Sequence, residues 1–79
     1  MEKQLQMIPS QPLQQGEQIR IRKAVSERVY TLTKIPDARQ VLFKSLFRAL
    51  KERYGVDSYK DIPRYQMQNA LHFIAKWRG

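Results

Sequence analysis

Three stretches of this sequence carry apolar residues at steps of three and four, and this spacing constrains the fold more than any other feature. It is the period of an amphipathic α-helix that turns one apolar face toward a core. The three apolar sets are Ile21, Ala24, Val25, Val29 and Leu32; Leu42, Phe43, Leu46, Phe47, Ala49, Leu50 and Tyr54; and Met67, Ala70, Leu71, Ile74 and Trp77. The pattern therefore predicts three helices.

The junction between the first two helices is marked by a proline. Pro36 disfavours helical backbone at the residue before it, so the first helix, which starts near Glu17, should end by residue 35. Asp37 stands three residues before Gln40, which is the spacing of a capping box. We therefore expect Asp37 to start the second helix.

A glycine and a second proline mark the later junction. Gly55 follows the second apolar set and suits the left-handed residue that closes a helix. Pro63 fits the first turn of a third helix, because the missing N–H of proline has no helical partner there. The sequence predicts a short turn around residues 58–61 and a third helix that runs to about Trp77.

The length of 79 residues allows one domain. Residues 1–16 are rich in Gln, include Pro9 and Pro12, and show no sustained apolar period, so they cannot bury enough surface to offset the entropy of ordering. We expect an all-α fold: a compact three-helix bundle over residues 17–79, preceded by a flexible tail or linker over residues 1–16.

Several functional classes are disfavoured by what the sequence lacks. It has no Cys, His72 is its single His, and its three glycines form no phosphate-binding loop. The four Ser and seven acidic residues stand in no pattern typical of a nucleophile or an acid–base pair. We therefore expect no enzyme, no catalytic residue, no metal, no cofactor and no small-molecule substrate. The absence of Cys, of a signal peptide and of a membrane-spanning run predicts a cytoplasmic protein.

The net charge of +8 is concentrated in the middle of the chain. Residues 20–53 contain ten Lys or Arg against three acidic residues. A concentrated basic stretch is typical of a nucleic-acid-binding protein. The alternative interpretation is a domain that simply exposes Lys and Arg to water.

On the second helix, Lys44, Arg48 and Lys51 fall opposite the apolar face, at i, i+4 and i+7. We predict that these three residues, with Arg20 and Lys23 of the first helix, contact phosphate groups. An ordinary solvated face is the alternative, although only Glu52 interrupts the basic charge. Those five residues are the primary predicted nucleic-acid-binding set.

The third helix offers a second candidate surface along one flank, formed by Tyr65, Asn69, His72 and Lys76. These side chains can stack on bases, hydrogen-bond with base edges or contact phosphate, although a half-exposed flank would look the same. Phe73 and Trp77 are candidates for a protein interface.

Arg28 is unusual because the helical spacing places it inside an apolar face. A charge there is costly unless it is paired, so we expect its stem to lie along the core with its head in solvent, or its head to pair with a carboxylate. Asp61, Asp57 and Glu52 are the candidate partners. A position in a partner-binding site is the other interpretation.

Residues 21–77 resemble the ORF6C domain, the C-terminal module of many phage antirepressor-type proteins. The resemblance rests on three pieces, which are Arg22–Val25 with Glu27–Tyr30, Leu46–Lys51 with Arg53–Val56, and Ser58–Pro63 with Ala70–Leu71 and Phe73–Ile74. It implies a regulator of phage genes whose C-terminal part binds DNA or another protein, and it transfers no catalytic residue.

Together, the residues and the resemblance predict a phage or prophage regulatory module of the bacterial cytoplasm. It would bind nucleic acid, most simply DNA, through a basic helical face, as an antirepressor-like regulator of transcription. The alternative is a protein-interaction module that forms a homodimer or binds a repressor or an acidic host factor.

Overall fold

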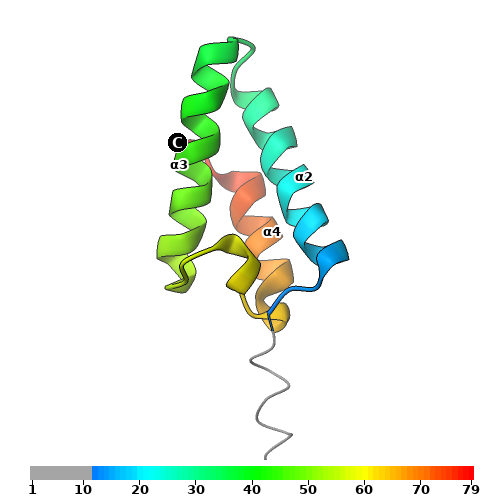
Figure 1. Cartoon of the computed structure of the whole chain (residues 1–79). Helices are drawn as coiled ribbons and strands as arrows, with labels where there is room; N and C mark the ends of the chain where they lie inside the picture. The colour runs from blue at the N-terminus through cyan, green and yellow to red at the C-terminus, as the bar shows by residue number, and fades with distance from the viewer. Residues whose placement is uncertain (1–11) are drawn as a thin grey trace, which may run out of the picture.

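The computed structural model describes residues 12–79, which form an all-α bundle (Figure 1). Its helices are α2 (Gln15–Leu32), α3 (Pro36–Tyr54) and α4 (Met67–Lys76), and two short 3-10 turns, η2 (Tyr59–Asp61) and η3 (Arg64–Gln66), precede α4. Helices α2 and α3 run antiparallel, and α4 packs behind them (Figure 1). The described residues confirm the predicted bundle of three helices.

The core lies where the apolar faces of the three helices meet. Its buried residues are Ile21, Val25 and Val29 of α2, Leu46 and Leu50 of α3, and Met67, Ala70 and Ile74 of α4, together with Leu13 and Ile62. The helical members all belong to the sets predicted from the apolar spacing. Since a side chain of this size contributes roughly 1.5 to 3 kcal/mol when fully buried, these contacts hold the three helices together.

The turn between α2 and α3 differs from its prediction in one detail. Ile35 is the N-cap of α3 and Pro36 occupies the first helical position. The capping box predicted at Asp37 and Gln40 is therefore wrong, and Asp37 lies in the first turn. Proline can start the helix one residue earlier because its fixed φ suits that position and its missing N–H has no helical partner there.

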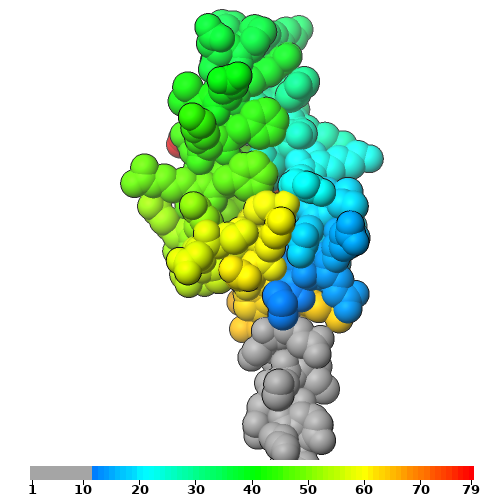
Figure 2. All heavy atoms as spheres, in the orientation of Figure 1, coloured from blue at the N-terminus to red at the C-terminus, as the bar shows by residue number. Residues whose placement is uncertain are grey.

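The connection from α3 to α4 follows its sequence signals closely. Gly55 closes α3 with φ 63°, in the left-handed region that favours glycine. Ser58 Oγ accepts a hydrogen bond of 3.2 Å from the backbone N–H of Lys60, which confirms the predicted turn. Pro63, however, caps η3 rather than the helix itself, so α4 begins only at Met67. This connection crosses the front of the bundle (Figure 2).

The folded unit begins earlier than the boundary predicted after residue 16. Leu13 is only 3% exposed and belongs to the core, and Pro12 lies alongside Pro63 in an isolated antiparallel bridge. A single apolar residue before a helix has no period, so the sequence pattern did not reveal its burial. The rest of the predicted tail, residues 1–11, lies outside the described residues.

Glu17 fixes the start of α2 to the loop that precedes α4. Its Oε1 accepts hydrogen bonds from the backbone N–H of Gln14, at 2.8 Å, and from Arg64 Nε, at 3.0 Å. The bond from Gln14, followed by the pairing with Arg64, holds the pKa of Glu17 below its ordinary value. The carboxylate is therefore stabilised in its charged form in the folded chain.

We predict that Leu13→Ala lowers the free energy of unfolding by about 2 to 4 kcal/mol, because it opens a cavity in the core. Urea denaturation followed by circular dichroism measures this change. The control is Ile35→Ala, since Ile35 is 63% exposed and its loss should change stability by no more than about 0.5 kcal/mol. Equal stabilities for the two variants would contradict the placement of Leu13 in the core.

A second prediction concerns acid. Because the folded pKa of Glu17 is lowered, its stabilising contribution is complete above its unfolded pKa of about 4.3 and is lost as pH falls through the folded pKa. The stability difference between the wild type and Glu17→Gln should be constant near neutral pH and shrink below about pH 4. Denaturation curves at stepped pH test this, and a difference that persists in acid would contradict it.

Candidate nucleic-acid interface

Lys44, Arg48 and Lys51 project from α3 as the α3 ridge, and all three are exposed. Arg48 Nε lies 3.2 Å from Glu52 Oε2, and the two side chains are 78% and 68% exposed. Asp57 lines the same shallow hollow as Lys51. Exposed pairs of this kind contribute at most about 1 kcal/mol and exchange readily with other ions. The ridge is therefore cationic, but carboxylates stand beside two of its three members.

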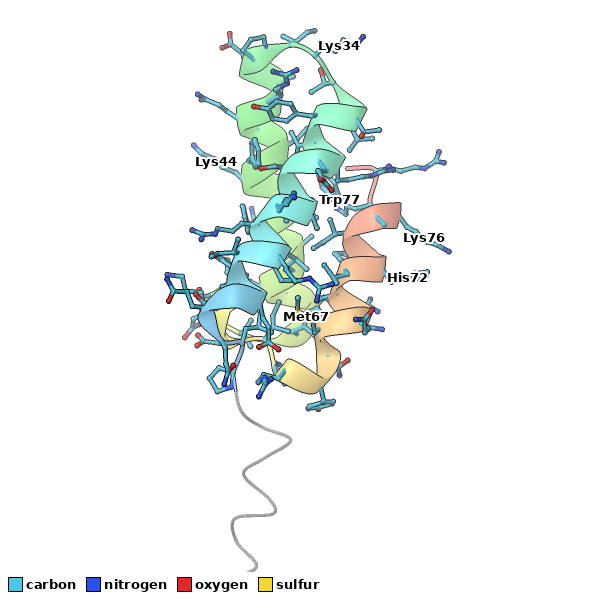
Figure 3. All side chains as sticks on the ribbon, turned by 90° about the vertical axis from the view of Figure 1, so that its right-hand side faces the viewer. Lys34, Lys44, Met67, His72, Lys76 and Trp77 are labelled. Carbon is cyan, nitrogen blue, oxygen red and sulfur yellow. The ribbon has the colours of Figure 1, made fainter. Side chains whose placement is uncertain are left out.

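Arg20 and Lys23 do not extend the α3 ridge. They are exposed on α2 and line a shallow groove with Leu71 of α4 and with Glu27. Figure 3 shows Lys44 on one side of the bundle and His72 and Lys76 on the other. The five residues predicted to contact phosphate thus divide between two faces, and Arg20 and Lys23 belong to the side of α4.

Helix α4 presents a polar outer face with no acidic residue. None of its residues from Met67 to Lys76 is Asp or Glu. Its exposed residues are Gln68, Asn69, His72, Ala75 and Lys76. Three members of the predicted flank, Asn69, His72 and Lys76, lie on this face. Tyr65 lies on η3, where it is 66% exposed, so it is not part of the helical stripe.

A groove of about 220 Å³ runs between α3 and α4. The residues that line this α3–α4 groove are Arg53, Asn69, His72, Phe73, Lys76 and Trp77. Two of the six are permanent cations and none is a carboxylate. The hollows beside Lys51 and Lys23, in contrast, include Asp57 and Glu27. The α3–α4 groove thus joins positive charge to aromatic side chains without a competing acid in its lining.

Asn69 is held at the edge of this groove by two residues of α3. Its Oδ1 accepts a hydrogen bond from the Tyr54 hydroxyl and bonds of 3.4 Å from Nε and Nη2 of Arg53. A guanidinium can only donate, so the carbonyl end of the amide must face it. The amide nitrogen of Asn69 is therefore directed away from α3, and the side chain offers solvent a donor.

Phe73 and Trp77, the predicted protein interface, are half-buried and pack against the core. The Arg53 guanidinium lies over the Phe73 ring, 4.9 Å from its centroid, where a cation–π contact holds it. Both aromatic residues line the α3–α4 groove. They do not form an exposed apolar patch.

Arg28 has a different partner from any of the three predicted acids. Its Nε donates a hydrogen bond of 2.7 Å to the backbone carbonyl of Trp77, the residue that closes α4. The prediction of a carboxylate partner at Asp61, Asp57 or Glu52 is therefore wrong. A carbonyl at the end of a helix carries partial negative charge, so it suits a guanidinium. Arg28 anchors the end of α4 to α2.

Arg53 and Tyr54 are the site residues that the sequence reasoning missed. A sequence signal for Arg53 was present, because it lies on the same side of its helix as Leu46 and Leu50, much as Arg28 does on the first helix. A cation on the edge of an apolar face indicates a contact with a neighbouring helix. The neighbour, Asn69, stands 16 positions along the chain, and only the packing of α4 shows it.

The sequence model of the ORF6C domain matches residues 1–79. The chain belongs to the ORF6C family. ORF6C domains are associated with phages, and the resemblance seen in the sequence is confirmed. No curated protein and no solved structure matches this ORF6C chain significantly.

None of the helices in the described part of the chain is long and apolar enough to cross a membrane. Within residues 12–79, acidic and His side chains form no cluster of three or more that could hold a metal ion.

Proposed function

We propose that this ORF6C domain is a non-catalytic nucleic-acid-binding module of a phage-type regulator, working in the cytoplasm of a bacterial host and seating a duplex against α4. The observation that carries the proposal is the acid-free outer face of α4, with the acid-free α3–α4 groove on one side and Arg20 and Lys23, next to Glu27, on the other. Such a face suits a polyanion, because neutralised phosphates release bound counterions.

The two flanks of α4 supply the phosphate contacts. Arg20 and Lys23 lie on the α2 side, and Arg53 and Lys76 line the groove on the α3 side. Helix α4 has ten residues and is about 15 Å long. Because the major groove is about 12 Å wide and admits one helix, the outer face of α4 can approach base edges while the flanks contact the backbone.

The α3 ridge is the competing location. Its Lys44 lies on the opposite side of the bundle from His72 and Lys76 (Figure 3), so one straight duplex cannot contact all three. Glu52 and Asp57 next to the ridge would repel phosphate, whereas the α3–α4 groove has no carboxylate in its lining. The charge distribution therefore favours the side of α4.

Two triple variants with equal net charge test this location. One replaces Arg20, Lys23 and Lys76 by Gln, and the other replaces Lys44, Arg48 and Lys51 by Gln. Each lowers the net charge from +8 to +5. We predict that the first triple weakens binding to random-sequence duplex DNA and lowers the slope of log affinity against log salt by roughly 2 to 3. The second should change that slope much less.

Fluorescence anisotropy across a salt series measures both quantities. A larger loss in the ridge triple would move the interface to α3. Equal losses of affinity in the two triple variants would indicate general electrostatic attraction with no preferred binding face. A wild-type protein that binds no duplex, but elutes as a dimer in size-exclusion chromatography, would reject the proposal and favour protein interaction.

A further inference from the structure

We propose that the edge of the α3–α4 groove distinguishes guanine from adenine, because Tyr54 and Arg53 engage the Asn69 carbonyl and leave its amide nitrogen as a donor to solvent. This inference rests on the nucleic-acid binding proposed above and adds a sequence preference to it. The orientation of Asn69 supports it, because the contacts with Tyr54 and Arg53 determine which end of the amide faces solvent.

A free Asn recognises adenine through two bonds at once. Its carbonyl accepts from the adenine N6 amino group while its amide nitrogen donates to N7. In this chain the Asn69 carbonyl already accepts from the Tyr54 hydroxyl and the Arg53 guanidinium. Because the Tyr54 hydroxyl and the Arg53 guanidinium already donate to this carbonyl, it must give up one of them to accept from adenine, so the two-bond adenine contact is disfavoured.

The same arrangement leaves donors for a different base edge. The Asn69 amide nitrogen can donate and cannot accept, and Arg53 and Lys76 beside it, which the proposal above assigns to phosphate, bring no acceptor to the base edge. His72 can do either. Guanine presents two acceptors in the major groove, N7 and O6, whereas adenine presents one acceptor and one donor. A surface composed mainly of donors therefore matches guanine, and the adenine amino group would face donors.

The packing around the groove keeps these donors in place. Arg53 is held over the Phe73 ring, 4.9 Å from its centroid, and by its bonds to Asn69. The cost of ordering the Arg53 and Asn69 side chains is therefore met when the chain folds, before any ligand arrives. His72 and Lys76 extend from α4 away from the bundle (Figure 3), where a base edge can reach them. Fixed donors at a protruding helix give selectivity as well as affinity.

The first experiment selects duplexes from a randomised pool with the full chain and sequences those that are retained. The enriched site is then synthesised with 7-deazaguanine at each guanine in turn, which removes only the N7 acceptor. We expect one guanine at which this replacement weakens binding by roughly 5- to 20-fold. Asn69→Ala should bind the natural and the modified duplex equally, because the donor that N7 would meet is gone.

Two further variants separate the role of the donor from a general loss of binding. In Tyr54→Phe the Asn69 carbonyl loses one donor, so we expect the preference for guanine over adenine to narrow. The matched control is Gln40→Ala, because Gln40 carries an exposed amide at the start of α3, away from the groove. It should keep both the preference and the sensitivity to 7-deazaguanine.

The possible results test the preference for guanine separately from the proposed nucleic-acid binding. Binding without base preference, or a preference for adenine that Asn69→Ala removes, would overturn the donor-only groove and leave nucleic-acid binding intact. Sensitivity to 7-deazaguanine that survives in Asn69→Ala would also overturn it. Failure of the wild type to bind any duplex would overturn both.

Discussion

The packing of α4 against α2 and α3 is the contact on which the proposed function depends. A helix of ten residues is marginal in water by itself, so α4 takes its stability from the apolar face formed by Met67, Ala70 and Ile74. Both of its ends are also fixed from α2. Glu17 pairs with Arg64 just before α4, and Arg28 holds the carbonyl of Trp77 at its end. Once the inner face is buried, the opposite face must meet solvent.

Charge decides which exposed surface can hold a polyanion. The net charge of +8 spreads over both sides of the bundle, so it cannot by itself select a face. The positions of the carboxylates distinguish the α3 ridge from the side of α4. Glu52 and Asp57 lie beside the α3 ridge and Glu27 lies beside Arg20 and Lys23, whereas α4 itself carries no acidic residue and the α3–α4 groove has none in its lining. The distribution of carboxylates therefore favours α4 as the binding surface, whereas the sequence alone predicted a primary site that included the basic residues of α3.

The sequence predicted the fold more fully than the site, for a physical reason. Apolar spacing reports burial directly, so Ile21, Leu46 and Ile74 were placed in the core correctly. Gly55 was recognised because few other residues adopt its backbone conformation readily. Leu13 was missed because it stands alone before a helix. The contacts of Arg28 and Asn69 could not be derived, since they join residues 49 and 16 positions apart and depend on how α4 packs.

In the proposed complex a duplex lies against α4 and leaves the α3 ridge in water. The most direct measurement is a titration of the isotopically labelled chain with duplex DNA, followed by amide and side-chain NMR shifts. We predict the largest shift changes at Asn69, His72 and Lys76, with smaller ones at Arg20 and Lys23. Changes centred on residues 44–51, with α4 unaffected, would contradict it.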